Sequence, residues 1–300
     1  MRRREFVAAL TAAGLNQDRL LRGQSSTHPP FRTGIVPANS GRQTSAEDTY
    51  WSNCDAVAAL GFHFVEFNDT RSGIVEAWSS RAGEFREKMT KRHLTFAGAA
   101  LFSHMADSTK TRELIDRHML LGKFLRDVGG AYITHMIAPG TVLNEPADDS
   151  EYAQLDVGIW AEHANEIGKR LANEFGVSLA YHPEQGEIRR GLHESILDAT
   201  EDRWLRLLID TGHVASAGYD AVAIVKQYRT RLVCIHLKDF SSESHPRKPG
   251  NVSLGTGAVN IQQVVGFLRD TGFAGWVMAE SGGTNEHMRD YMSGRLGLVL

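Results

Sequence analysis

Four apolar segments in the second half of the chain each end on a side chain that can bind a metal ion or move a proton. The runs VSLAY, RLLI, LVCI and WVMA lead into His182, Asp210, His236 and Glu280, in that order. A lone ionisable group at such a position is costly to bury, and carboxylates packed closely together repel and raise each other's pKa. A divalent cation removes both costs, and mixed oxygen and nitrogen ligands suit Mn²⁺, Co²⁺, Mg²⁺ or Zn²⁺. The set therefore predicts one divalent-metal site.

Other polar residues, at or beyond the ends of apolar segments, are candidates for contacts with substrate hydroxyl groups. They are Glu66, His104, His135, His213, Lys238 and Arg247. Each candidate also has a plainer interpretation. Asp210 alone would cap the helix that follows it, and His135 alone would be a satisfied core histidine. Lys238 and Arg247 alone would be solvated surface charges, so the hypothesis rests on the whole set and not on one residue.

The elements that must position these residues alternate regularly along the chain. Short apolar runs rich in β-branched or aromatic residues are followed by longer segments of helical periodicity. The expected strands are 32–37, 62–67, 94–101, 131–137, 177–182, 206–210, 232–237 and 276–280. The expected helices are 45–60, 74–92, 108–128, 151–174, 190–200, 218–230, 260–271 and 285–297.

Eight such strand–helix units indicate an α/β protein with a parallel sheet covered by helices. A doubly wound sheet would carry GxGxxG after its first strand, but the chain has ANSGRQTSAED there. The later GTGAVN, residues 255–260, follows a polar loop, and we interpret it as the entry to a helix. We therefore expect a single-domain (β/α)8 TIM barrel over residues 31–300, with its active site at the C-terminal ends of the strands.

The amino-acid composition argues against several classes of partner and of covalent structure. The 300 residues are 42% hydrophobic and 23% charged, as in a globular protein. A net charge of −3 argues against a nucleic-acid surface. No apolar run approaches the roughly 18 residues of a membrane span. Cys54 and Cys234 form no CxxC motif, so we expect free thiols and no disulfide framework.

The N-terminal segment has some features of an export leader and lacks others. MRRREFVAALTAAGL resembles a twin-arginine export leader, but its apolar run is short and no A-x-A cleavage site follows. We treat residues 1–30 as an N-terminal extension or a degenerate twin-arginine leader outside the barrel. A cytoplasmic location is slightly favoured, and export stays open.

Three stretches give the chain a specific resemblance. They are DTGH at 210–213, HLKD at 236–239 and GTGAVNIQQVVGFLRDTGFAGWVMAES at 255–281. With them, residues 31–298 resemble the xylose isomerase-like TIM barrels of the sugar phosphate isomerase/epimerase group. The resemblance implies that Asp210, His236 and Glu280 bind one divalent metal ion. We expect that ion to be Mn²⁺, with Co²⁺, Mg²⁺ or Zn²⁺ as alternatives.

The resemblance implies a fourth metal ligand, a glutamate at the end of the fifth strand. This chain departs from the family at that position. VSLAYHPE places His182 at that position and Glu184 two residues later. Relatives similar to inosose dehydratases also carry YHP here. We prefer His182 as the fourth ligand and keep Glu184 as the alternative.

A metal ion that polarises a carbonyl and the adjacent hydroxyl acidifies the C–H bond between them. A carboxylate, Glu280 or Glu184, would remove that proton to give an enediolate. We therefore predict a metal-dependent isomerase or epimerase of a ketose or keto-polyol. One alternative is an inosose dehydratase-type lyase acting on a keto-cyclitol or keto-glycoside, and another is a non-catalytic sugar-binding barrel. The expected partner is a small sugar or cyclitol, with no nucleic acid or membrane, and homo-oligomerisation stays open.

Overall fold

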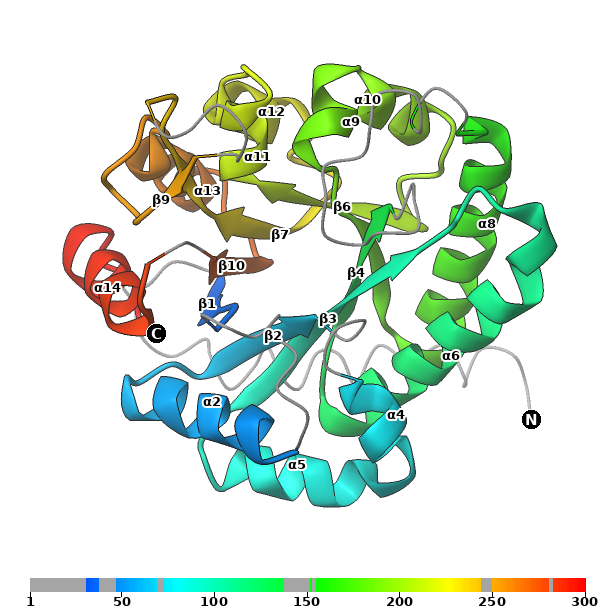
Figure 1. Ribbon diagram of the computed structural model, residues 1–300, viewed down its shortest axis with the longest axis horizontal. Helices are drawn as coiled ribbons and strands as arrows, with labels where there is room; N and C mark the ends of the chain where they lie inside the picture. The colour runs from blue at the N-terminus through cyan, green and yellow to red at the C-terminus, as the bar shows by residue number, and fades with distance from the viewer. Residues whose placement is uncertain are drawn as a thin grey trace, which may run out of the picture.

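The computed structural model describes residues 31–37, 47–68, 73–137, 152, 155–243, 250–280 and 283–300. The expected N-terminal extension, residues 1–30, lies outside these residues. Eight parallel strands in the described part close into a barrel in the order β1-β10-β7-β6-β5-β4-β3-β2 (Figure 1). These strands are β1 Arg32–Ile35, β2 Phe64–Asn68, β3 Thr95–Ser103, β4 Tyr132–Ile137, β5 Ser178–Tyr181, β6 Leu205–Asp210, β7 Leu232–Leu237 and β10 Trp276–Ala279. The expected (β/α)8 barrel is confirmed.

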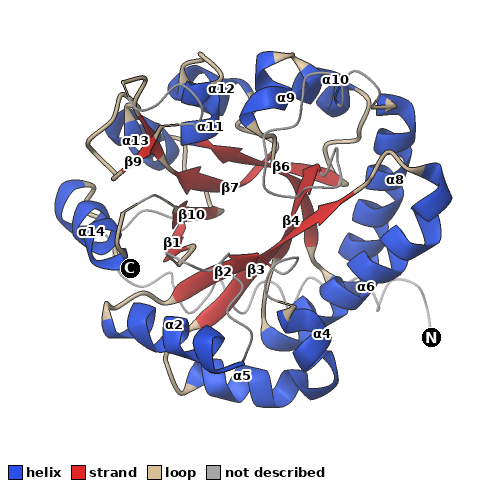
Figure 2. Cartoon of the chain, in the orientation of Figure 1, coloured by secondary structure: helices blue, strands red, loops and turns tan. Residues whose placement is uncertain are grey.

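Helices form a ring around the strands (Figure 2). The α-helices are α2 Glu47–Ala59, α4 Ile74–Trp78, α5 Ala82–Thr90, α6 Thr111–Val128, α8 Val157–Arg170, α9 Gln185–Arg189, α10 Leu192–Asp198, α11 Thr211–Ser216, α12 Ala221–Gln227, α13 Ile261–Asp270 and α14 Asn285–Asp290. The 3₁₀ turns are η1 Ser79–Arg81 and η2 Ser108–Lys110, and the π-helical turns are η3 Leu171–Phe175 and η4 Tyr291–Arg295. No described helix is both long and apolar enough to span a bilayer.

Three features differ from the expected elements. The helix expected over 74–92 is divided by the turn η1. The helices α9 and α11 follow β5 and β6 closely, and each is too short to show a helical period in the sequence. A small antiparallel pair, β8 Asp239–Phe240 and β9 Asn251–Val252, lies in the connection after β7.

Asp239 holds the glycine-rich loop that precedes α13. Its carboxylate accepts hydrogen bonds from the backbone N–H groups of Gly255, Gly257 and Val259, at 2.9, 2.9 and 3.1 Å. A Cβ atom at Gly257 would lie 2.3 Å from Asp239 Oδ1, so only glycine fits there. Asn260 then caps α13 by accepting from the N–H of Gln263, which agrees with the expected helix entry.

The outer layer of the core lies between the barrel and its helices. Phe85 of α5 packs edge-to-face on Phe96 of β3 and on Phe124 of α6, with ring centroids 5.6 and 5.1 Å apart. Each of these rings is at most 1% exposed. Burial of one such side chain stabilises the fold by about 1.5–3 kcal/mol, so this layer fixes the strands that carry the polar residues.

The inner layer lies inside the barrel. Its buried members come from six different strands, and only the barrel interior brings such residues together. They are Ala97, Tyr132, Ala180, Leu208, Cys234 and Met278. Side chains two positions apart on a strand point to the same side. The residues two positions after the last four of these are His182, Asp210, His236 and Glu280, which therefore lie one layer further toward the C-terminal mouth.

Candidate metal centre

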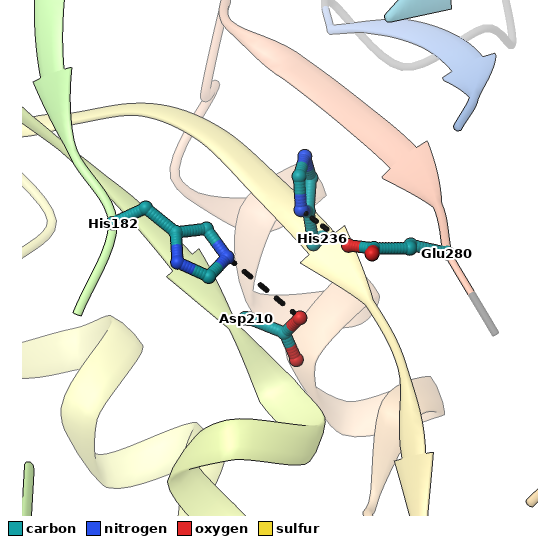
Figure 3. A group of neighbouring side chains, drawn as sticks. All are labelled: His182, Asp210, His236 and Glu280. Carbon is teal, nitrogen blue, oxygen red and sulfur yellow. Dashed lines mark ion pairs between the residues drawn. The ribbon is translucent and has the colours of Figure 1, made fainter. Parts of the chain in front are cut away.

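Four side chains from neighbouring strands converge at the C-terminal mouth of the barrel (Figure 3). Ligand atoms of His182, Asp210, His236 and Glu280 all lie within 4.8 Å of one another. His182 Nε2 is 3.8 Å from Asp210 Oδ2, and His236 Nδ1 is 2.7 Å from Glu280 Oε2. The first three residues are buried and Glu280 is half-buried. The structure thus brings together the four residues at which the apolar segments end.

Asp210 uses its two oxygens in different ways. Oδ1 accepts hydrogen bonds from the backbone N–H groups of Gly212 and His213, at 2.8 and 3.1 Å, and so caps α11. Oδ2 faces the cluster, 2.7 Å from the Lys238 ammonium. The helix-cap and ligand interpretations of this residue are therefore compatible.

The side chain of Lys238 is buried among the acidic groups. Its Nζ lies 2.7 Å from Asp210 Oδ2, 3.3 Å from Glu280 Oε1 and 3.2 Å from His213 Nε2. Burial alone would raise the pKa of Asp210, but His213 and Lys238 hold it well below its usual value. Burial alone would likewise raise the pKa of Glu280, and Lys238 and His236 lower it. Both carboxylates are therefore ionised.

Glu184 pairs with His213 beside the four-residue cluster. Glu184 Oε2 lies 2.9 Å from His213 Nδ1, whereas Glu184 Oε1 is 3.9 Å from His182 Nδ1. Burial would raise the pKa of Glu184, but the neighbouring His213, His182 and Lys238 lower it to about 2. Glu184 is thus an ionised carboxylate next to the cluster and not a member of it.

The donor atoms of the cluster fit a cation. Asp210 Oδ2 and His236 Nδ1 are buried, and neither makes a hydrogen bond within the described structure, although charged groups lie close to both. The neighbouring charges offset part of the cost of burying these two atoms, and a cation bound by both would give each a direct partner. Two imidazoles and two carboxylates are also a ligand set that divalent transition metals accept. His182 Nε2 and Glu280 Oε2 would complete the set.

Glu66 lies below this cluster, inside the barrel, and is 1% exposed. Its carboxylate accepts hydrogen bonds from the Tyr132 hydroxyl at 2.7 Å and the Thr134 hydroxyl at 3.2 Å. Its Oε2 is also 3.0 Å from His236 Nε2. The sequence suggested a substrate contact for Glu66, whereas the structure places it on the inner side of His236.

Among the other candidates, the structure turns His135 away from the cluster. His135 points out of the barrel, because Tyr132 and Thr134 occupy the inward positions of β4 and His135 has the opposite parity. Its ring packs against Trp160 and His118, with centroids 5.7 and 5.6 Å away. His104 is half-buried in the loop after β3. Arg247 lies outside the described residues.

One residue that the sequence did not single out supports the site. Glu187 is fully buried, and its Oε2 accepts the backbone N–H of Glu184 at 2.9 Å. The Tyr181 hydroxyl donates to Glu187 Oε1. Burial raises the pKa of Glu187 to about 8. The sequence could have pointed to Glu187, because Glu184 and Glu187 are three residues apart. This spacing is typical of a capping box at the start of a helix.

Comparison with known proteins agrees with this architecture. The family model described as Xylose isomerase-like TIM barrel matches residues 54–294. An inosose dehydratase from Clostridium perfringens is 28% identical over 157 residues, which cover 46% of this chain and 52% of that protein. The matched stretch thus spans about half the length of this curated relative.

Two solved structures share the fold at low sequence identity. A xylose isomerase-like TIM barrel protein from Mycobacterium smegmatis, in complex with magnesium, is 16% identical with a TM-score of 0.68, covering 91% of this chain and 97% of that one. The 3-keto-D-glucoside 4-epimerase from E. coli is 14% identical with a TM-score of 0.60, covering 88% of this chain and 98% of that one.

Proposed function

The chain belongs to the xylose isomerase-like TIM-barrel family, and on this basis we propose that it is a divalent-metal-dependent isomerase or epimerase. Its substrate would be a small ketose or keto-polyol, from which it removes a proton next to the carbonyl group. The observation that carries this proposal is the convergence of His182, Asp210, His236 and Glu280 at the barrel mouth, with a separate ionised carboxylate beside them.

His182, Asp210, His236 and Glu280 would hold the cation, with Mn²⁺ our first choice. A bound divalent ion would supply Lewis acidity toward the carbonyl oxygen of a substrate. His182 is preferred over Glu184 as the fourth ligand, because Glu184 is held by His213 at 2.9 Å. The half-buried side of the cluster, at Glu280, is where a substrate can approach.

Glu184 is the preferred proton acceptor. The carboxylate is ionised, and it is not one of the four clustered ligands. Glu280 is the second candidate, but both of its oxygens lie within 3.3 Å of His236 or Lys238. Lys238 Nζ and His213 Nε2 lie 3.2 Å apart beside the cluster, and both side chains would contact substrate hydroxyl groups. Return of the proton to the other face or to the neighbouring carbon gives an epimer or an isomer.

A second candidate function is a dehydratase acting on a keto-cyclitol or keto-glycoside. Two observations favour it, the similarity to inosose dehydratase and the position of His213. Burial lowers the pKa of His213, but Asp210 and Glu184 raise it, and the net shift is upward. An imidazole at this position, 2.9 Å from the proposed base, would be the acid that gives a proton to a departing hydroxyl group.

The test is turnover in D₂O by Mn²⁺-loaded protein, with ketoses, 3-keto-glycosides and keto-inositols as substrates. We expect deuterium at the carbon next to the carbonyl, in an epimeric or isomeric product or in recovered substrate. Loss of water from a keto-inositol would identify the dehydratase instead. Product that forms at a normal rate without deuterium would rule out proton transfer, and a protein inactive on the whole panel would favour a sugar-binding barrel.

A further inference from the structure

The second ring nitrogen of His236 faces a buried carboxylate from a strand three places away around the barrel. Glu66 is on β2 and His236 is on β7, and these strands are not neighbours in the closed sheet. Glu66 Oε2 and His236 Nε2 are nevertheless 3.0 Å apart, with good hydrogen-bond geometry. Both residues are almost fully buried. The contact therefore spans the barrel interior immediately below the metal cluster.

The surroundings of Glu66 decide the direction of this hydrogen bond. The Tyr132 hydroxyl donates to Oε2 and the Thr134 hydroxyl donates to Oε1, so both oxygens act as acceptors. Tyr132 stays a donor, because burial raises its pKa well above the usual value. Toward these hydroxyl groups the two carboxylate oxygens of Glu66 are acceptors, and the remaining partner of Oε2 is His236 Nε2. His236 Nε2 must then carry a hydrogen and donate it to Glu66.

The other nitrogen of the same ring behaves differently. His236 Nδ1 is buried, points toward Glu280 Oε2 at 2.7 Å and makes no hydrogen bond of acceptable geometry. A histidine that donates from one nitrogen can offer the lone pair of the other to a metal ion. The ring thus presents a donor to Glu66 and a ligand atom to the cluster.

We propose that Glu66 is a positioning residue that fixes His236 with Nε2–H toward the barrel interior and Nδ1 toward the bound cation. The proposal rests on the metal centre of the proposed function and goes beyond it, because it assigns the ligand atom and the residue that selects it. Carboxylates in this role orient metal-binding histidines and raise their basicity. Tyr132 and Thr134 hold the carboxylate itself in place.

The test compares Glu66→Leu with Glu66→Gln. Leucine removes the acceptor, whereas the glutamine amide oxygen can still accept from His236 and Tyr132 while its NH₂ group donates to Thr134. We expect Glu66→Leu to weaken Mn²⁺ binding by about 10–100-fold in a chelator-competition titration. Glu66→Gln should lose much less. Leu208→Ala is the matched control, because it opens a cavity in the same inner layer and removes no hydrogen-bond acceptor from His236, and it should leave the affinity nearly unchanged.

Nitrogen-15 NMR of histidine-labelled protein shows which ring nitrogen of His236 binds the metal and which carries hydrogen. A purely structural role of Glu66 would not determine this. In the Zn²⁺-loaded protein, His236 should be metal-bound through Nδ1 with its hydrogen on Nε2. Coordination through Nε2, or Mn²⁺ affinity in folded Glu66→Leu equal to that of the unsubstituted protein, would overturn the proposal.

Failure of the metal centre itself gives a different result. An unsubstituted protein that binds no divalent ion would overturn the proposed function. In that case the Nε2–H signal of His236 in the metal-free protein still tests the contact. We expect it to be protected from exchange and to lose that protection in Glu66→Leu, and an exchange rate that does not change would overturn the role of Glu66.

Discussion

The ammonium nitrogen of Lys238 lies 2.7 Å from Oδ2 of Asp210, the carboxylate oxygen that also faces His182. The lysine therefore places a positive charge of the protein's own next to the proposed cation. Two ionised carboxylates, Asp210 and Glu280, share this ammonium. Its position also explains how these carboxylates are tolerated when they are buried.

Lys238→Met should destabilise the metal-free protein by about 3–5 kcal/mol, because it removes the ammonium group that Asp210 and Glu280 share. Saturating Mn²⁺ should restore much of this loss, since an ion that binds only the native state at 100 times its Kd adds about 2.7 kcal/mol. Urea unfolding with and without Mn²⁺ measures both quantities. Lys238→Arg, which keeps the charge, is the control. A metal-free Lys238→Met protein as stable as the original would contradict this role.

Asp210→Asn and His236→Ala should each weaken metal binding by more than about tenfold, because the first takes the charge from one of the four proposed ligands and the second removes another. Elemental analysis after dialysis and a Mn²⁺ titration measure the loss. Asp220→Asn is the matched control for the first variant, because Asp220 caps α12 through Val222 N–H at 2.9 Å in the way that Asp210 caps α11. Full occupancy in Asp210→Asn would leave only the helix-cap role.

His182→Ala and Glu184→Gln should differ in which property they reduce, metal affinity or turnover rate. The first should weaken metal binding, because His182 Nε2 is part of the cluster. The second should keep the metal and lose about 10²–10⁴-fold in rate, the usual contribution of a positioned general base. Metal content and turnover are measured on the same samples. The reverse pattern would make Glu184 the fourth ligand.

His118 should make the fold sensitive to acid. Burial lowers its pKa from 6.5 to about 4, so the folded state favours the neutral ring. The stability from this group is complete above pH 6.5 and declines as the pH falls toward 4, with a loss of about 2 kcal/mol at pH 5. His118→Leu should flatten this dependence of the unfolding free energy between pH 7.5 and pH 5. An unchanged slope would show that other groups, such as the neighbouring His135, control acid unfolding.

The sequence by itself determined the barrel and the strand ends that meet at its mouth. Eight strand–helix units in succession are compatible with few architectures. In a parallel barrel the C-terminal ends of all strands lie at the same end of the barrel. His182, Asp210, His236 and Glu280 could therefore be grouped before any coordinates, although they are spread over about a third of the chain. Helices of five or six residues, such as α9 and α11, were missed because they are too short to show a helical period.

Only the tertiary structure decided which way individual side chains point. His135 and Thr134 are adjacent in the sequence, but the pleat sends Thr134 to Glu66 and His135 to the helices outside. The contact between Glu66 and His236 joins residues 170 positions apart. No local pattern specifies it, because the closure of the barrel and the register of its strands determine which side chains meet across the interior.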